Sequence, residues 1–403
     1  MKKLLLILLC LPMIGFGQGW IKGYVDVVSY SVAQTNDGGY IVTGGINTPN
    51  NRSNAWLLKT DGQGNQEWVN TFGGPEIDGC YAVKQTTDGG YILSGFIGET
   101  DTSSGEIWIF KTDIFGTQIW SNTYGSGRAE YSVQQTTDGG YVISTSSNDI
   151  LKIDSSGITE WSCDYSPHID QIFSIKQTVD GGYIMTGLIT YGAPGVDVCT
   201  IKVNSIGGVE WIKTYGNNTF FNESRDIEQT TDGGYIIAGT KGITNNTCLA
   251  WLLKTNNQGD TLWTNIFSEI YSTVAFSVAE TTDGGYIVSG GTGIDESTME
   301  ILLLKTDLNG NKQWSEVFGA GISFSVEQTI DGGYIVAGFS FANQNLIKTD
   351  ANGNVTSTIN IDGNANRKLQ KTVDILGRET QQTNQPLFYI YDDGTVEKRI
   401  VIE

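Results

Sequence analysis

The chain is poor in the residue types on which most catalytic and metal sites depend. Its 403 residues include a single histidine and only five cysteines. Histidine-based metal sites, and most pairings of a nucleophile with a base, therefore lack the side chains they need. The sequence also contains no GxSxG, HExxH or phosphate-loop motif. These absences argue against the commonest hydrolase chemistries and leave carboxylate chemistry open.

Positive charge is scarce as well. Lysine and arginine total 24 against 44 aspartates and glutamates, which gives a formal net charge of −20. A protein of this charge repels a phosphate backbone. We therefore do not expect a nucleic acid as a partner.

The first 17 residues have the features of a secretory signal peptide. Two lysines precede an apolar run from Leu4 to Ile14, and small residues at Gly15 and Gly17 follow as a cleavage site. The run has eleven residues, well short of the about 20 that cross a bilayer as a helix. We expect residues 1–17 to be removed and the mature protein to be secreted or displayed on the cell surface, with no transmembrane segment.

A glycine-rich segment recurs seven times along the chain. The first copy, from Gln34 to Tyr40, reads Gln-Thr-Asn-Asp-Gly-Gly-Tyr, and successive copies lie 42 to 52 residues apart. This spacing is the length of a four-stranded propeller blade with variable loops. The aspartates of the seven copies are Asp37, Asp88, Asp138, Asp180, Asp232, Asp283 and Asp331.

A second marker occurs in six of the repeats: Asp or Asn, two residues, glycine, three residues and tryptophan. Together the two markers predict strands at 31–35, 40–44, 56–60 and 67–72 in the first repeat, joined by turns that need glycine. We expect an all-β protein. The six tryptophans are Trp68, Trp120, Trp161, Trp211, Trp263 and Trp314.

The seventh repeat lacks its tryptophan, because Ser357 stands in that position. A counterpart lies at the other end of the chain, where residues 20–24 (Trp-Ile-Lys-Gly-Tyr) are similar to residues 211–215 (Trp-Ile-Lys-Thr-Tyr). We predict a seven-bladed β-propeller over residues 18–357 that the N-terminal strand closes, which removes exposed strand edges. An open solenoid is the alternative, and it predicts capping repeats at the termini.

The Asp-Gly-Gly and Asp-x-x-Gly turns share one side of the predicted propeller, here called the turn face. Because these turns are nearly the same in every blade, turn geometry explains their aspartates better than catalysis does. Calcium is the alternative at residues 307–311 and 350–354, which hold oxygen ligands, although both loops are shorter than the twelve-residue calcium loop. For the whole chain we expect no metal, no cofactor and no catalytic residue.

The opposite side, here called the variable face, carries the loops between blades and those between the second and third strands of each blade. Such loops often carry function on a rigid scaffold. Four places before the repeated Gln or Glu, the innermost strands hold an aromatic residue in six blades, whereas the fifth blade has Arg225. The six aromatic residues are Tyr30, Tyr81, Tyr131, Phe173, Phe276 and Phe324.

The deviation at Arg225 marks a candidate ligand site, because a loop rich in aromatic and amide side chains lies beside it. Such groups stack against polar ligands and form hydrogen bonds with them. The alternative is a local ion pair of Arg225 with Glu223 or Asp226 and no ligand. The candidate site residues are Arg225, Phe220, Phe221, Glu223, Tyr191 and His168.

Acidic pairs on the variable face keep an enzymatic alternative open. A glycosidase needs two carboxyl groups roughly 5 to 10 Å apart. The three pairs are Glu76 with Asp78, Glu99 with Asp101, and Asp295 with Glu296.

The repeat ends before residue 364, and the composition then changes. Asp374, Gly377 and Arg378 belong to an Asp-x-Leu-Gly-Arg motif, and Gly394 and Lys398 to a Gly-x-Val-x-Lys motif. A tail with these motifs resembles the type A C-terminal sorting domain of the type IX secretion system.

The resemblance covers residues 364–403, which follow a linker at 358–363. It implies a short β domain, recognition by the type IX secretion machinery, passage across the outer membrane, and release or surface attachment. An ordinary terminal hairpin is the alternative. For the whole chain we expect a non-catalytic module that binds a glycan or a protein, with a polysaccharide-active hydrolase and a structural surface protein as alternatives.

Overall fold

The computed structural model describes residues 19–48, 52–100, 105–190, 195–216, 220–244, 247–268, 272–294, 298–340, 346–355, 360–361, 369–373, 386–391 and 396–400. These residues form strands and turns without an α-helix, so the all-β prediction is confirmed. Within these ranges we find no helix with the length and hydropathy to cross a membrane. The chain divides into two compact units, residues 1–360 and residues 361–403.

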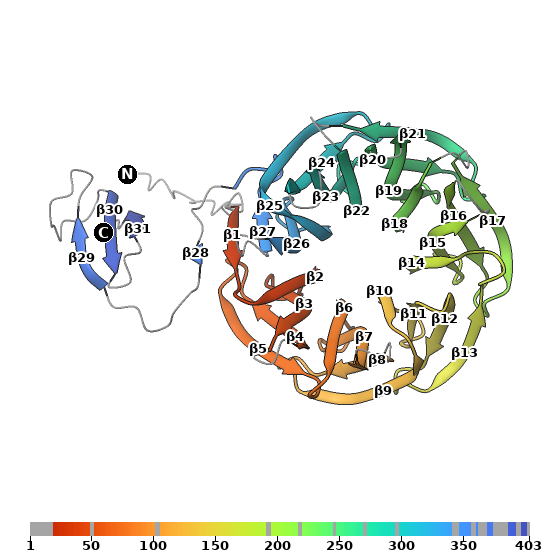
Figure 1. The fold of residues 1–403 in the computed structure, drawn as a ribbon, viewed down its shortest axis with the longest axis horizontal. Coiled ribbons are helices and arrows are strands. Elements are labelled where there is room, and N and C mark those ends of the chain that lie inside the picture. The colour runs from red at the N-terminus through yellow and green to blue at the C-terminus, as the bar shows by residue number, and fades with distance from the viewer. Residues whose placement is uncertain are drawn as a thin grey trace, which may run out of the picture. The chain divides into compact units, whose positions relative to one another are not determined.

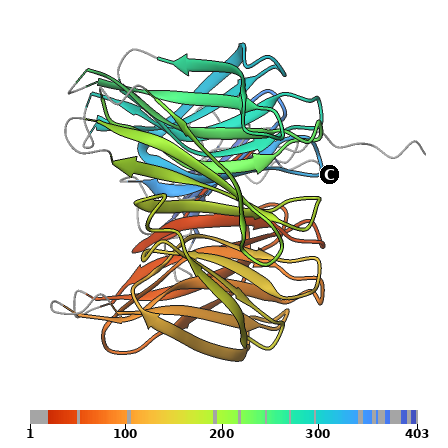
Figure 2. The same ribbon diagram turned by 90° about the vertical axis from the view of Figure 1, so that its right-hand side faces the viewer.

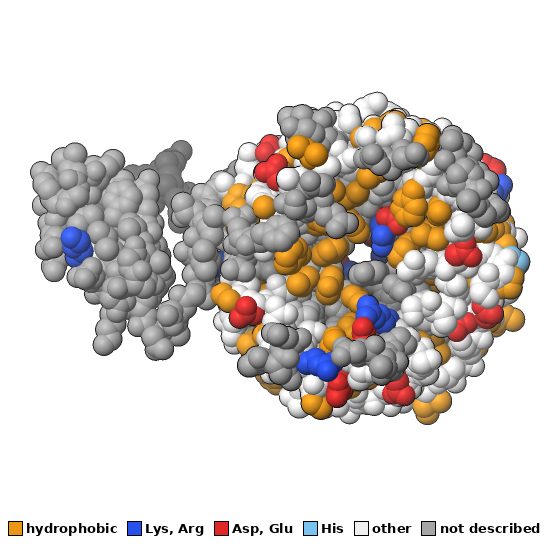
Figure 3. Space-filling view, in the orientation of Figure 1, with side chains coloured by type: hydrophobic (Ala, Val, Ile, Leu, Met, Phe, Trp, Pro, Cys, Tyr) orange, Lys and Arg blue, Asp and Glu red, His pale blue; other side chains and the backbone are white. Residues whose placement is uncertain are grey.

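In the first unit, antiparallel strands stand in groups of four around a common axis (Figure 1), where the space-filling view shows the opening of a central channel (Figure 3). Seen from the side, the strands run between the two faces of the ring (Figure 2). Five groups are separate sheets whose strands follow chain order. Their strands are β2 (Val27–Gln34), β3 (Tyr40–Asn47), β4 (Ser53–Thr60) and β5 (Gln66–Phe72); β6 (Ile77–Gln85), β7 (Tyr91–Glu99), β8 (Glu106–Thr112) and β9 (Gln118–Ser126); β10 (Ala129–Gln135), β11 (Tyr141–Thr145), β12 (Asp149–Ile153) and β13 (Thr159–Asp164); β14 (Gln171–Gln177), β15 (Tyr183–Thr190), β16 (Val196–Val203) and β17 (Val209–Tyr215); β18 (Asn222–Gln229), β19 (Tyr235–Thr244), β20 (Thr247–Thr255) and β21 (Thr261–Phe267).

The remaining strands of the ring share one sheet, because a single long strand serves two groups. β25 (Lys312–Gln328) pairs with β24 through its first half and with β26 through its second half. The other members are β22 (Ser272–Glu280), β23 (Tyr286–Gly293), β24 (Glu300–Thr306), β26 (Tyr334–Ser340), β27 (Leu346–Thr349), β1 (Trp20–Gly23) and β28 (Asn360–Ile361).

The first and last described strands of the repeats lie side by side. β1 pairs antiparallel with β27, which places Trp20 opposite Lys348. The same pairing of tryptophan and lysine recurs in the other groups, for example Trp68 opposite Lys59. The group that contains β26 and β27 also contacts the first group, since the Ile330 N–H donates to Gln34 Oε1 at 2.8 Å.

The strands of the first group are longer than the sequence markers indicated. β2 begins at Val27 instead of residue 31, β3 continues to Asn47, and β4 begins at Ser53. The extra length of these three strands lies toward the variable face. The repeated residues mark the turn-face ends of the strands, whereas backbone pairing continues beyond them where side chains differ between blades.

The hydrophobic core lies between neighbouring groups. Ile41 and Leu57 of the first group pack with Leu93 and Phe110 of the second, all fully buried. Burial of aliphatic and aromatic side chains contributes roughly 25 cal/mol per Å² of apolar area. Each group therefore needs both of its neighbours to bury its apolar side chains.

The two sequence markers meet where a tryptophan of one group contacts a glycine of the next. A Cβ atom on Gly116 would come within 2.6 Å of the Trp68 indole. Gly116 also has a φ of +75°, which glycine adopts without strain. A Cβ atom on Gly64 would likewise come within 2.6 Å of the Trp20 ring.

Each Asp-Gly-Gly turn lies over a lysine whose side chain is only 2–4% exposed. In the first group, Lys59 Nζ lies 2.9 Å from Asp37 Oδ2 and donates to the Thr60 carbonyl oxygen at 3.0 Å. The Asp37 carboxylate also accepts from the Gly39 N–H. The seven lysines are Lys59, Lys111, Lys152, Lys202, Lys254, Lys305 and Lys348.

This arrangement explains the repeated aspartates by turn architecture, because an ammonium group of the chain itself neutralises each one. The alternative calcium loops likewise use their oxygens within the turn: Asp307 accepts from the Asn309 and Asn311 N–H groups at 2.9 and 2.8 Å. Asp350 accepts from Asn352 and Asn354 in the same way.

The second unit contains a three-stranded antiparallel sheet in the order β29 (Leu369–Val373), β30 (Pro386–Tyr391) and β31 (Val396–Ile400). Lys398 stands in β31 opposite Phe388. The other residues of the predicted sorting signal, Asp374, Gly377, Arg378 and Gly394, lie outside the described residues, as does the predicted signal peptide.

Candidate functional site

The inner strands carry a ring of mostly aromatic side chains around the channel, here called the axial ring. Tyr30 lies 5.1 Å from Tyr81 and 5.3 Å from Phe324 between ring centroids, and Phe276 lies 5.3 Å from Phe324. The side chain of Tyr131 lies outside the described residues. The described members are Tyr30, Tyr81, Phe173, Arg225, Phe276 and Phe324.

Arg225 occupies the place of an aromatic residue and contacts the rings on both sides. Its guanidinium carbon lies 4.1 Å from the Phe173 ring centroid and 5.3 Å from that of Phe276. Such cation–π contacts are attractive, more so where water is excluded. Arg225 also binds Glu223 through two contacts, Nε to Oε1 and Nη2 to Oε2, both 2.9 Å. The local ion pair with Glu223 therefore exists alongside the candidate cavity.

A cavity of about 400 Å³ opens beside Arg225, and we call it the mouth cavity. Its volume lies within the range of small-molecule sites. Hydrophobic side chains and a few basic ones gather around the opening of the channel (Figure 3). The mouth cavity is lined by Tyr81, Arg128, Gln171, Phe173, Leu188, Phe221, Glu223 and Arg225.

A second arginine borders the mouth cavity and has its own partners. Arg128 donates from Nη1 to the Tyr81 hydroxyl at 3.0 Å and forms an ion pair with Glu99. Its guanidinium carbon lies 4.5 Å from the Phe96 ring centroid. Partial burial alone would lower the pKa of Arg128, but the contact with Glu99 outweighs it and raises the pKa. Both arginines are therefore paired with glutamates, which leaves the cavity close to neutral.

The structure brings together three of the candidate residues predicted from sequence. Phe221, Glu223 and Arg225 line the mouth cavity. Phe220 and His168 are described but do not line it, and His168 is exposed. Tyr191 lies outside the described residues.

Sequence reasoning missed Arg128, Gln171 and Leu188, which come from three different positions of the repeat. Gln171 begins β14, Leu188 lies in β15, and Arg128 precedes β10. None of them breaks a repeated motif, so the comparison of blades that singled out Arg225 gave no signal for them. They come together at the mouth cavity because the ring brings neighbouring blades side by side.

Of the three acidic pairs, only Glu76 with Asp78 lies wholly within the described residues, and both of these carboxylates have partners. Asp78 is fully buried and accepts from the Gly74 and Gly98 N–H groups at 2.6 and 2.7 Å, which links the segment before β6 to the end of β7. Glu76 lies 3.5 Å from Arg52. Glu99 binds Arg128. Asp101, Asp295 and Glu296 lie outside the described residues.

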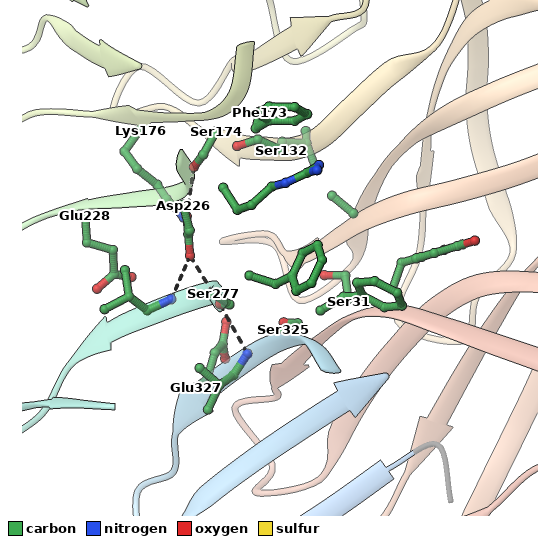
Figure 4. A pocket seen from close by; sticks show the side chains of 18 of the residues that line it. Ser31, Ser132, Phe173, Ser174, Lys176, Asp226, Glu228, Ser277, Ser325 and Glu327 are labelled. Carbon is green, nitrogen blue, oxygen red and sulfur yellow. Dashed lines mark hydrogen bonds and ion pairs between the residues drawn. The ribbon is translucent and has the colours of Figure 1, made fainter. Parts of the chain in front are cut away.

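A second, smaller cavity of about 90 Å³ lies in the channel between the axial ring and the turn face. We call it the channel cavity. Serine hydroxyls and charged side chains line it, and Figure 4 shows several of them directed toward the channel. The charged side chains are Lys84, Lys176, Arg225, Asp226, Glu228 and Glu327.

Asp226 takes the place of a serine that recurs in most inner strands. It accepts from the Ser174 hydroxyl at 2.8 Å and from the Val278 N–H at 3.2 Å (Figure 4). Lys176 Nζ lies 3.5 Å from the same carboxylate. The ion pair of Lys84 with Glu327 lies in the same part of the channel. Two lysines thus neutralise two carboxylates.

Glu228 has no ion-pair partner within 4 Å among the described residues. Its Oε2 accepts from the Glu280 N–H at 3.1 Å. Burial raises the pKa of Glu228 to about 7, although the positive charge of Lys176 acts in the opposite direction. The side chain therefore changes charge near neutral pH.

Comparisons with known proteins identify the fold. No protein-family model matches the sequence, and no curated protein sequence matches it. Solved propeller structures do match. The chain is a β-propeller.

Three examples show the extent of the match. The WD40 propeller domain of Doa1 is 14% identical, with a TM-score of 0.55 over 81% of this chain and 94% of that domain. Sqt1 of Chaetomium thermophilum is 9% identical, with a TM-score of 0.54 over 83% and 98%. A streptogramin B lyase is 12% identical, with a TM-score of 0.54 over 82% and 96%. At these identities the likeness shows the propeller fold alone.

Proposed function

We propose that the protein is an exported, seven-bladed β-propeller that binds a glycan in the mouth cavity without catalysis. In this proposal β1 closes the ring as the outer strand of the last blade. The ring is the rigid scaffold, and the loops of the variable face supply the specificity.

The neutral, aromatic character of the mouth cavity carries this proposal. Phe173 and Phe221 offer ring faces, and Gln171 and Tyr81 offer hydrogen-bonding groups. Arg128 and Arg225 are each paired with a glutamate, so an anionic ligand would have to displace an existing partner. Uncharged sugars combine apolar faces with hydroxyl groups, which suits this lining.

Binding of the mature chain to an array of glycans tests the proposal directly. We expect binding to one group of related glycans, with loss of affinity in Phe221→Ala and Gln171→Ala. Ile330→Ala is a matched control, because Ile330 is 91% exposed on the turn face. Equal binding by all four proteins would contradict the mouth cavity as the site, and capture of a protein instead of a glycan would contradict the ligand class.

We further propose that the N-terminal 17 residues direct export and that residues 364–403 direct passage through the type IX secretion machinery. The motifs in both termini support this proposal. The sorting tail would leave the protein secreted or attached to the cell surface, where glycans are abundant.

A further inference from the structure

The charged groups of the channel cavity do not balance. Three carboxylates, those of Asp226, Glu228 and Glu327, face two ammonium groups, those of Lys84 and Lys176. Arg225 also reaches the cavity, but two contacts with Glu223 use its charge. One negative charge is therefore left over, and it lies on Glu228.

Leaving this charge in a half-buried position costs free energy, because burial disfavours an ionised carboxyl group without a partner. The fold does not require it. Gln134 occupies the equivalent place two blades earlier and accepts the equivalent bond, from the Gln177 N–H at 2.7 Å. A neutral amide thus suffices for the contact between blades that Glu228 makes with Glu280.

We propose that the channel cavity is a second binding site, separate from the mouth cavity, and that it takes a small organic cation whose primary ammonium group binds Glu228. An ammonium group has three donors and no acceptor. Glu228 supplies the opposite charge, and the serine layer supplies hydroxyl acceptors. The serines that line the cavity are Ser31, Ser132, Ser174, Ser277 and Ser325.

An organic cation fits this cavity better than a metal ion. Calcium prefers six to eight oxygen ligands, and the described residues contain no group of three or more acidic, histidine or cysteine side chains placed to hold a metal. The axial ring at one end of the cavity, which includes Phe276 and Phe324, offers aromatic faces to the carbon atoms of the ligand.

Binding should depend on pH, because only ionised Glu228 attracts the ammonium group. Four neighbouring groups influence the pKa of its carboxyl group. Lys176 on β14, Lys84 on β6 and the Glu280 N–H on β22 lower it, whereas Asp226 on β18 raises it. With the pKa of Glu228 at about 7, affinity should fall by up to about tenfold per pH unit below neutrality.

Calorimetric titration of the mature chain with ethanolamine hydrochloride at pH 8 tests the proposal. We expect saturable binding at one site, no binding of uncharged ethylene glycol, and weaker binding at pH 6. Glu228→Gln should weaken binding about ten- to hundredfold, the effect of losing a hydrogen bond to a charged group. Gln134 shows that the amide is compatible with the fold at this position.

Glu280→Gln is the matched control. It removes the same charge from the neighbouring strand, it does not line the cavity, and six other repeats carry glutamine there. Absence of ethanolamine binding, equal binding by Glu228→Gln, or competition by calcium chloride would each overturn the proposal. Phe221→Ala should keep its affinity for ethanolamine, so failure of the mouth cavity as a glycan site would be distinguishable from failure of this site.

Discussion

Trp20 lies directly opposite Lys348 in the β1–β27 pair, as Trp68 lies opposite Lys59 within a continuous stretch of chain. The Trp20 indole donates to the Gly62 carbonyl oxygen at 3.2 Å, and its ring meets Tyr40 with centroids 5.7 Å apart. A residue from the start of the chain thus makes the contacts that an outer-strand tryptophan makes in the middle of it.

We expect Trp20→Ala to lower stability by about 3 kcal/mol, the usual cost of removing a large buried aromatic side chain. Thermal and urea unfolding of the mature chain measure the change. Trp68→Ala is the control, because it removes the equivalent side chain from an interior blade. Destabilisation by Trp68→Ala alone would show that β1 does not close the ring.

The buried lysines give a second prediction. Lys202 has two carboxylate partners, Asp180 at 2.9 Å and Glu210 at 3.0 Å. Lys254 has one among the described residues, Asp232 at 2.8 Å. Removing the sole partner of a buried charge is costly, about 3 kcal/mol. Asp232→Asn should therefore destabilise the protein more than Asp180→Asn, and equal losses in urea unfolding would contradict the role of the second carboxylate.

The same turns predict loss of stability in acid. Partial burial alone would raise the pKa of Asp180, but hydrogen bonds from Thr178 and Lys202 outweigh it and lower the pKa to about 2. The pKa of Asp138 is also lowered to about 2. Carboxylates of this kind stabilise the fold fully above about pH 4, and the contribution disappears as the pH falls toward 2. Melting temperatures recorded from pH 6 to pH 2 should fall most steeply in that window.

Glu228 should have the opposite effect. Because burial raises its pKa to about 7, the folded state prefers the protonated form, and stability is lost as the pH rises from about 4.5 through 7. Glu228→Gln should raise the melting temperature at pH 8 and leave it unchanged at pH 4. A lower melting temperature at pH 8 would mean that the ionised carboxylate stabilises the channel.

Export provides a prediction for the tail. A chain truncated after residue 363 should accumulate in the periplasm of a host with type IX secretion, whereas the full chain should reach the medium or the cell surface. Fractionation and immunoblotting distinguish the two. Secretion of the truncated chain would contradict the sorting-signal proposal. Thermal unfolding of the purified truncated chain is the folding control, because a chain that fails to fold would be lost from all fractions for that reason alone.

Repetition made most of the fold predictable. Seven copies of the motif around Asp37 located the turns, and six tryptophans located the outer strands. The lysine beneath each turn was missed, although it recurs as regularly as the aspartate, because lysine is usually exposed. The contacts of Asp37 with Lys59 show how a half-exposed carboxylate makes burial of this side chain possible.

The candidate sites were less predictable, because most of their residues lie at positions that differ from blade to blade. Arg225 was visible because it breaks a pattern, but Gln171 and Arg128 belong to loops and strand ends that differ in every blade. Glu228 lies in a position that holds Ala33, Lys84 or Gln134 in other blades, so no single residue type is expected there. Its significance depends on the count of neighbouring charges, which requires coordinates.

The pairing of β1 with β27 also has a mechanical meaning. Elsewhere in the described part of the ring, the strands of a blade follow one another along the chain. β1 instead pairs with β27 at three register positions, from Trp20 to Lys22, and with β28 in the same sheet. If the N-terminal end of the chain is pulled, this short strand bears the load first. If β1 closes the ring as proposed, the ring should open at this strand under force while its interior blades keep their shape.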